Sequence, residues 1–145
     1  MSLDRAYDED NVFARIVRGE LPCAKVHEDD TTLAFMDAYP QARGHTLVIP
    51  KEVQAVNLLD TPQDVLGRLI VRAQLIAGAV VDALGPKGVR LMQFNGAAAG
   101  QSVFHVHFHV LPVYADEAER AHASEPVPVE ALQQTAALIR ARLTA

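Results

Sequence analysis

The chain has 145 residues, half of them apolar, a net charge of −5 and a single cysteine, Cys23. This length fits one compact domain, the lone cysteine excludes an internal disulfide framework or a Cys-rich metal site, and the acidic balance without a Lys/Arg cluster excludes the footprint of a protein that binds a nucleic-acid polymer. No apolar run approaches the about 18 residues of a membrane span, and residues 1–10 are acidic where a signal peptide is basic, so we expect a cytoplasmic protein with no membrane partner.

The first half of the chain predicts one short helix and three strands. Apolar residues at helical spacing follow Asp10 and Asn11, either of which can cap a helix that ends before Gly19. Three β-like runs come next, separated by turn sequences: residues 24–26, 32–36 and 46–49. Three antiparallel strands fit this pattern best.

A long helix is predicted between Thr61-Pro62 and Gly85-Pro86. Thr61 is the expected N-cap, Pro62 suits the first turn, and Gly85 suits the C-terminal end. The apolar residues between them keep the 3.6-residue period: Leu66, Leu69, Ile70, Ala73, Ile76, Ala77, Val80 and Leu84. Part of this stripe, Leu69, Ile76 and Val80, is also a candidate surface between two copies of the chain.

The second half predicts two more strands and a last helix. Residues 89–94 and 103–113 have strand character and flank a loop of small residues, 95–101. After a probable linker at residues 116–128, apolar residues repeat at alternating spacings of three and four: Val129, Leu132, Ala136, Ile139 and Leu143.

Strands and helices do not alternate one for one, so we expect an α+β fold, an antiparallel sheet with helices on one side, rather than a doubly wound parallel sheet. The chain would divide into a tail (residues 1–10), a domain (11–115), and a linker with a C-terminal helical extension (116–145).

The most informative segment is a stripe of three histidines, His105, His107 and His109, half of the chain's six. In a strand, alternate side chains point to opposite faces, so the histidines would line one face about 7 Å apart. The apolar residues between them would then enter the core: Phe104, Val106, Phe108 and Val110.

Three interpretations of the stripe are open. It can be the polar face of a half-exposed strand, although three histidines in succession are unusual there. It can bind zinc, with His45 as a fourth ligand, although no Asp, Glu or Cys stands at ligand-like spacing. It can also provide a nucleophile, because imidazole titrates near pH 6.5 and crowding disfavours protonation of all the rings together.

Residues 100–111, GQSVFHVHFHVL, resemble the signature of the histidine-triad family, in which three histidines alternate with apolar residues. The similarity continues through LAFMDAYPQA at residues 33–42 and HTLVIPK at 45–51, which resemble the family's nucleotide-binding half, and covers most of residues 11–113. The Gly-Gln-Ser-Val before the triad is most similar to the Hint branch of nucleoside phosphoramidate hydrolases. The resemblance implies a HIT-like fold with a five-stranded antiparallel sheet, a short N-terminal helix and a long central helix, here followed by a C-terminal helix.

The resemblance also implies a catalytic set. His107 would attack the α-phosphorus of a nucleotide and form a covalent nucleotidyl-histidine, which water cleaves to release a nucleoside monophosphate. His109 would bind the phosphate, and His105 and His45 would form the supporting imidazole network. Ser102 is a candidate to pass a proton to the leaving group.

A second implied set binds the substrate. The carboxylate of Asp37 would accept hydrogen bonds from the two ribose hydroxyls, and Asn95 would lie near the sugar and phosphate. Gln101 and Val103 would lie beside the phosphate, and Gly100 would let backbone N–H groups approach it closely.

The implied ligand is a purine nucleotide of the AMP type, and the implied assembly is a homodimer. No metal is expected, because the Cys-x-x-Cys pair and histidine that hold a structural zinc in many bacterial relatives correspond here to Asn11, Ala14 and Val53. A dinucleoside polyphosphate hydrolase of the same family and a non-catalytic nucleotide-binding module are the alternative functions.

Overall fold

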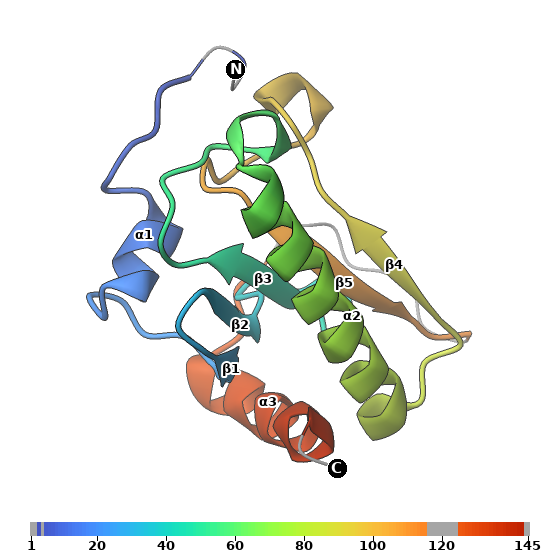
Figure 1. The fold of residues 1–145 in the computed structure, drawn as a ribbon. Coiled ribbons are helices and arrows are strands. Elements are labelled where there is room, and N and C mark those ends of the chain that lie inside the picture. Colours follow the sequence, from blue (N-terminus) through green and yellow to red (C-terminus); the bar gives the residue numbers. More distant parts are fainter. Residues whose placement is uncertain (1–2, 4, 116–124, 144–145) are drawn as a thin grey trace.

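The computed structural model describes residue 3 and residues 5–115 and 125–143, so most of the expected linker lies outside the described residues. In the described part, three α-helices and five strands follow one another as shown in Figure 1. Their order is α1 (Val12–Val17), β1 (Lys25–Glu28), β2 (Thr32–Met36), β3 (Thr46–Pro50), α2 (Gln63–Leu84), β4 (Gly88–Met92), β5 (Phe108–Val113) and α3 (Val129–Leu143). Two short 3-10 helices, η1 (Leu58–Asp60) and η2 (Ala97–Ala99), lie in the loops before α2 and before β5.

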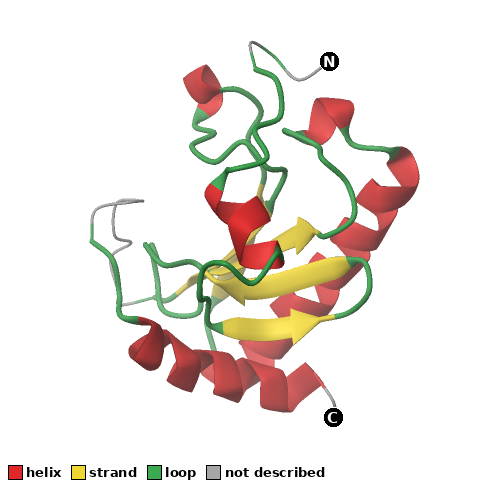
Figure 2. Cartoon of the chain, turned by 90° about the vertical axis from the view of Figure 1, so that its left-hand side faces the viewer, coloured by secondary structure: helices red, strands yellow, loops and turns green. Residues whose placement is uncertain are grey.

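The strands form one antiparallel sheet in the order β1-β2-β3-β5-β4. This confirms the expected α+β fold with a five-stranded antiparallel sheet. In Figure 2, α1 lies on one face of the sheet, and α2 and α3 lie on the other, so the expectation that the helices lie on one side is wrong for α1.

Alternation along the central strands produces two apolar clusters, one on each face. In β2, Leu33 and Phe35 pack with Phe13 of α1, whereas Ala34 and Met36 face α2 and α3. The α1 face therefore carries the smaller cluster, and the face covered by the long helices carries the main core.

Helix α2 differs from the sequence expectation at its start. Pro62 occupies the N-cap position without a side-chain cap, and the Thr61 hydroxyl donates instead to the Asn57 carbonyl at 2.6 Å. The expected Thr61 cap is wrong because this side chain closes the preceding η1 turn. The expected end is confirmed, since Gly85 adopts a left-handed conformation with φ of 65°.

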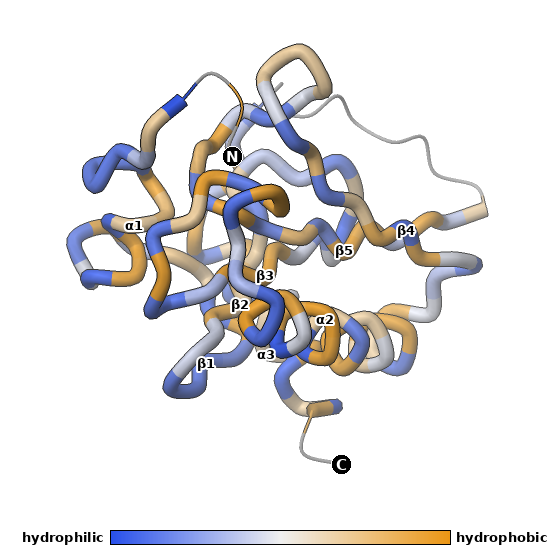
Figure 3. Tube along the Cα trace, turned by 45° about the horizontal axis from the view of Figure 1, so that its top comes forward, coloured by the Kyte–Doolittle hydropathy of each residue, from blue (hydrophilic) through white to orange (hydrophobic). Residues whose placement is uncertain are grey.

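Most of the apolar stripe expected in α2 faces the core, but Ile70, which the stripe included, is exposed. Leu69, Ile76 and Val80 are completely buried, so the suggestion that they contact a second copy is wrong. The exposed apolar residues of α2 are different ones: Ile70, Val71, Leu75 and Val81. Figure 3 shows apolar and polar residues alternating along this helix, because one side of α2 packs on the core and the other faces solvent.

Helix α3 has the expected bounds and buries Leu132, Ala136 and Ile139 against the main core. Just before it, the Val127 N–H donates to the Ala38 carbonyl at 2.9 Å. This bond ties the start of the C-terminal segment to the loop that follows β2.

The strand expected at residues 103–113 begins only at Phe108. Pairing with β3 stops at Val48 opposite Phe108, and the ladder cannot continue to Pro50, which has no N–H. The Val106 N–H donates instead to the Ala55 carbonyl at 2.9 Å. The expected alternation still places Val106 in the main core, but Phe104 does not join it. The strand expected at 89–94 is likewise shorter, because β4 ends at Met92.

Among the helices that the structure describes, none has both the length and the apolar character needed to cross a membrane.

Candidate active site

A pocket of about 220 Å³ is lined by residues of α1, β2, β3, β5 and α3. Most of its wall is apolar, and Phe13, Phe35 and Leu47 contribute to it. Its polar side chains include Asp37, Tyr39, Ser102, His107 and His109. An apolar pocket with a few convergent polar groups is typical of a small-molecule site.

His107 is buried and held in one tautomer. Its Nδ1 lies 2.7 Å from the carbonyl oxygen of His105, and because a carbonyl only accepts, Nδ1 carries the proton. The neutral ring therefore has its lone pair on Nε2. The Phe13 ring packs against it edge-on, with centroids 4.9 Å apart.

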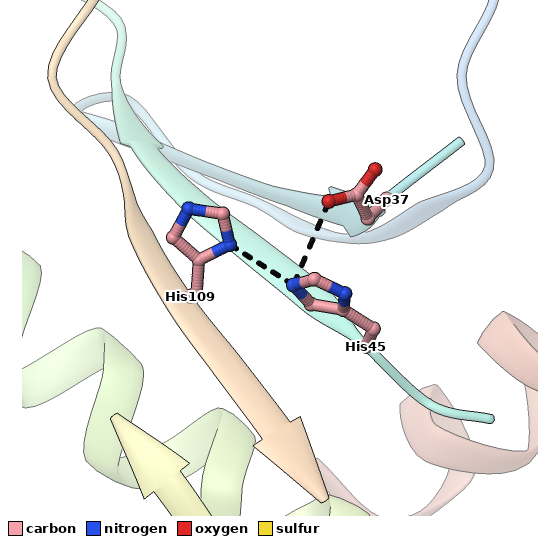
Figure 4. A group of neighbouring side chains, drawn as sticks. All are labelled: Asp37, His45 and His109. Carbon is pink, nitrogen blue, oxygen red and sulfur yellow. Dashed lines mark hydrogen bonds and ion pairs between the residues drawn. The ribbon is translucent and has the colours of Figure 1, made fainter. Parts of the chain in front are cut away.

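Behind the pocket, His109 contacts a second buried histidine, His45, as Figure 4 shows. The Gln41 N–H donates to His45 Nδ1 at 3.1 Å, so a neutral His45 carries its proton on Nε2. This Nε2 lies 2.9 Å from His109 Nδ1 and 3.5 Å from Asp37 Oδ2. The shorter distance favours donation to His109, which then carries its own proton on Nε2.

The backbone before His45 has a conformation that requires glycine. Gly44 has φ of +91°, and a Cβ at this position would lie 2.5 Å from Leu84 Cδ1. The turn that brings His45 behind His109 is therefore both left-handed and closely packed.

His105 lies outside the pocket wall, between β3 and the N-terminal segment. Its Nε2–H donates to the Pro50 carbonyl at 3.0 Å, and its Nδ1 accepts from the Tyr7 hydroxyl at 2.7 Å. Burial lowers the pKa of His105 to about 4, with a smaller effect in the same direction from His107. The ring is thus neutral at pH 7.

The three triad histidines do not follow ideal strand spacing. The rings of His107 and His109 are 4.9 Å apart between centroids, closer than the expected 7 Å or so, and His45 lies 5.2 Å from His109 on the same measure. Because β5 starts at Phe108, the irregular backbone before it brings the rings together.

In the loop before the triad, most of the groups expected to contact phosphate instead hydrogen-bond to other groups of the protein. The Gln101 amide donates to the Val56 carbonyl at 2.6 Å and accepts from Gly96 N–H at 2.9 Å, and its side chain is buried. The Gly100 N–H donates to the Ala97 carbonyl at 3.0 Å. These contacts stabilise the loop and leave neither the Gln101 amide nor the Gly100 N–H directed at a ligand.

Asn95 has a similar position. Its Oδ1 accepts from the Leu58 N–H at 2.9 Å, its amide pairs with that of Gln93, and it does not line the pocket. Ser102 and Val103, in contrast, both line the pocket beside the histidines. The substrate-binding residues expected from the sequence therefore form two groups: some line the pocket, and others stabilise the loop by hydrogen bonds within the protein.

The positions that hold structural zinc in relatives do not fit a metal here. Ala14 and Val53 have no ligand atoms, and Asn11 Oδ1 accepts the Ala14 N–H at 2.9 Å as the N-cap of α1. That the chain needs no metal remains a prediction.

One group within the described residues does have metal-ligand character: Asp37, His45 and His109, whose donor atoms lie within 4.8 Å of one another. The sequence analysis named Asp37 as a ribose ligand but did not group its carboxylate with these histidines, because Asp37 is distant from the triad along the chain. A chelator control is consequently required in any activity assay.

Sequence reasoning also missed Tyr7, Val129 and Leu132. Tyr7 contacts His105 from a segment expected to be a tail, and Val129 and Leu132 of α3 line the pocket. The amphipathic pattern of α3 predicted a buried face but not which part of the molecule that face covers.

Comparison with known proteins identifies the class. The HIT domain family model matches residues 18–116, more than half of the chain. The protein therefore belongs to the histidine-triad (HIT) family, which confirms the resemblance and supports a nucleotide-binding protein or nucleotide hydrolase in general terms.

Particular relatives are similar over different lengths. The chain is 41% identical over 120 residues to adenylylsulfatase HINT3 of Arabidopsis thaliana, covering 79% of this chain but only 60% of that protein. A crystal structure of a Hit-like protein involved in cell-cycle regulation from Bartonella henselae has a TM-score of 0.87 and 44% identity, covering 94% of this chain and 99% of the other. A Zn-bound histidine triad family protein from Mycobacterium smegmatis has a TM-score of 0.81 and 34% identity, covering 93% and 94%.

Proposed function

We propose that the protein hydrolyses a bond at the α-phosphate of a purine nucleotide, with nucleoside phosphoramidates as the substrate class and His107 as the nucleophile. The observation that carries this proposal is the 2.7 Å contact between His107 Nδ1 and the His105 carbonyl. It leaves the lone pair of a neutral, pocket-lining imidazole on Nε2, the form in which histidine is nucleophilic.

The reaction is a displacement in two steps. The Nε2 lone pair of His107 forms a bond to the α-phosphorus, and the bond from phosphorus to the amine nitrogen breaks. The amine leaves with the electron pair and takes a proton, for which the Ser102 hydroxyl is the proposed donor. Water then attacks phosphorus and gives up a proton, which restores the Ser102 hydroxyl, while the bond to Nε2 breaks with its electron pair returning to Nε2. A nucleoside monophosphate is released.

The His105 carbonyl assists the first step electrostatically. Attack by a neutral imidazole places positive charge on the ring, and a hydrogen bond from Nδ1–H to a carbonyl strengthens when its donor becomes charged. This interaction is stronger in the transition state than in the ground state, so it favours reaction rather than binding alone.

His109 is the proposed phosphate ligand. Donation from His45 to its Nδ1 places the His109 proton on Nε2, from where it can reach a non-bridging phosphate oxygen. The N–H groups of Ser102 and Val103 are further candidate donors, because both residues line the pocket.

Asp37 is the proposed ribose ligand, and the apolar wall is the proposed base site. Asp37 lines the pocket, and its Oδ1 is oriented by the Tyr39 N–H at 2.8 Å. We retain Gln101, Gly100 and Asn95 as residues that shape the phosphate loop rather than as side-chain ligands.

A second substrate has specific support. One relative is named an adenylylsulfatase, so adenylyl sulfate, in which the α-phosphorus bears a sulfate leaving group, is a candidate for this site as well. A dinucleoside polyphosphate would use the same histidines and would release a nucleotide in place of the amine or sulfate.

The decisive experiment measures turnover of an adenosine phosphoramidate by wild type, His107→Ala and His27→Ala, in chelator, with rapid acid-free quenching to trap the nucleotidyl-enzyme. His27 is a matched control, since it lies on β1 away from the pocket. We expect turnover and adduct in wild type and His27→Ala, and neither in His107→Ala. Turnover that disappears in chelator and returns with zinc would support a metal site at Asp37, His45 and His109 instead. Failure of folded wild type on all three substrate types would favour a nucleotide-binding role without catalysis.

We also propose a homodimer. Strand β4 is at an edge of the sheet, and its exposed Leu91 lies with exposed Ile70 and Val71 of α2 beside one shallow surface pocket. Light scattering should show a dimer for wild type and for Leu138→Glu on α3, and a monomer for Leu91→Glu. A dimer that persists in Leu91→Glu would contradict this assignment.

A further inference from the structure

The first part of the triad segment lacks the support of the sheet. Because β5 begins at Phe108 and Pro50 has no N–H, residues 104–107 are not in a strand ladder. The bond from Val106 N–H to the Ala55 carbonyl anchors the backbone at one point. His105 and His107 therefore depend on side-chain contacts for their orientation.

The N-terminal segment contacts two consecutive residues of this stretch, Phe104 and His105. The Tyr7 hydroxyl lies 2.7 Å from His105 Nδ1, and the two ring centroids are 5.7 Å apart. The Arg5 guanidinium lies 3.7 Å from the centroid of the Phe104 ring, a cation–π geometry. Both N-terminal residues precede the part of the chain that matches the HIT domain.

We propose that Tyr7 is a positioning residue for the reaction at His107, acting through His105. Its hydroxyl fixes the His105 ring against β3. The backbone carbonyl of His105 in turn accepts from His107 Nδ1–H, which leaves the lone pair of His107 on Nε2. This inference rests on the proposed function of the same site.

The hydrogen-bond chemistry permits only one arrangement. The Pro50 carbonyl accepts from His105 Nε2–H, so His105 Nδ1 is left as an acceptor, and the Tyr7 O–H is its donor. Every member of this chain is satisfied only while His105 is neutral and in the Nε2–H tautomer.

Two contacts then connect the N-terminal segment to the nucleophile. His105 is 2% exposed, so its ring has little access to solvent while Tyr7 is in place. Loss of the hydroxyl leaves a buried acceptor unpaired, which favours rotation of the ring or the other tautomer. Either change breaks the bond from His105 Nε2–H to the Pro50 carbonyl, so the backbone carbonyl that His107 Nδ1 contacts at 2.7 Å is less firmly held.

The test compares Tyr7→Phe with Tyr114→Phe. Each variant removes one hydroxyl, and the Tyr114 hydroxyl donates at 2.8 Å to the Arg43 carbonyl, in the loop before His45, rather than to a triad residue. With the adenosine phosphoramidate, we expect kcat of Tyr7→Phe to fall by about tenfold, the effect of losing one buried hydrogen bond, with KM changed by less than about twofold. Tyr114→Phe should keep the wild-type kcat.

The second measurement is spectroscopic and needs no substrate. The ¹⁵N signals of the histidine side chains distinguish protonated from unprotonated ring nitrogens. In wild type we expect His105 to be protonated at Nε2 and His107 at Nδ1, and we expect Tyr7→Phe to shift both residues toward mixed tautomers. Arg5→Gln, which leaves the hydroxyl in place, should perturb the same signals less.

The outcomes separate this proposal from the proposed function. A wild-type kcat in Tyr7→Phe, or a loss no larger than in Tyr114→Phe, overturns the positioning role. Unchanged His105 and His107 signals in folded Tyr7→Phe overturn it as well, even if no substrate is turned over. If wild type is inactive on every substrate but Tyr7→Phe shifts both histidines, the coupling stands and the assigned reaction fails.

Discussion

Replacement of Gly44 by alanine tests whether the turn before His45 is as closely packed as the structure indicates. Two costs are expected. Residue 44 has φ of +91°, which costs an alanine about 1–3 kcal/mol in backbone strain. Its Cβ would also lie 2.5 Å from Leu84 Cδ1, the movable end of a side chain, and 3.3 Å from Cγ of the more rigid Pro112 ring. Such overpacking costs a further amount of about 1–2 kcal/mol.

Two other glycines of the same chain separate these costs. Gly85 has φ of +65° with no atom near its would-be Cβ, so Gly85→Ala should cost only the left-handed strain, about 1–2 kcal/mol. Gly78 is within α2 and also has open space, so Gly78→Ala should stabilise by about 0.5–1 kcal/mol. Gly44→Ala should be the most destabilised of the three, by about 2–5 kcal/mol relative to wild type.

Urea unfolding of the three variants and wild type measures these differences directly. The reasoning is refuted if Gly44→Ala is no less stable than Gly85→Ala, because the packing contribution would then be absent. A second readout is the adenosine phosphoramidate assay, in which Gly44→Ala should lose activity through His45 while Gly85→Ala and Gly78→Ala keep it.

The pH dependence of stability and the role of α3 give two further predictions. Burial lowers the pKa of His105 from the ordinary 6.5 to about 4, so the unfolded chain takes up a proton in this range that the folded chain does not. The free energy of unfolding should therefore be unaffected by this group above pH 6.5 and fall by up to about 1.4 kcal/mol per unit as the pH drops toward 4, and His105→Asn should show a flatter curve; equal slopes would contradict this. Val129→Trp, which fills the pocket from α3, should raise KM by about tenfold or more, whereas Leu138→Trp on the exposed face of α3 should leave KM unchanged; equal KM values for both would show that α3 does not touch the ligand.

The elements that the sequence predicted best are those that bury one face. Strand β2 has the expected bounds, and α3 also begins and ends where its apolar spacing indicated. In both elements, the spacing of apolar residues that are close in sequence indicates which residues are buried. The helix cap at Thr61 was wrong because its hydroxyl had a nearer acceptor in the η1 turn, which no periodicity reveals.

The start of β5 illustrates a different limit. Alternation reports which face a side chain takes, and Val106 does enter the core as expected. It does not report whether a neighbouring strand can supply the ladder bonds. That depends on Pro50, which is distant in sequence and becomes relevant only once the strand order is known.

Residues of the candidate site were named from the sequence, but the contacts between them were not. The three triad histidines and Asp37 were found from the sequence, and the structure brings His107, His109 and Asp37 to one pocket. The links between them could not be predicted. The bond from Tyr7 to His105 joins residues 98 positions apart, and no local pattern marks either as the partner of the other.

Val129 and Leu132 in the pocket wall show that the residues proposed for the reaction and the residues that would contact the ligand need not lie in the same part of the chain. The proposed reacting groups lie within residues 18–116, which the HIT domain matches, whereas part of the pocket surface comes from a helix beyond that range. Reaction chemistry and ligand selectivity can therefore diverge independently in evolution. Two relatives with the same triad and different C-terminal helices would share a mechanism while serving different metabolites, and exchanging only this helix between them should transfer selectivity without altering the chemistry.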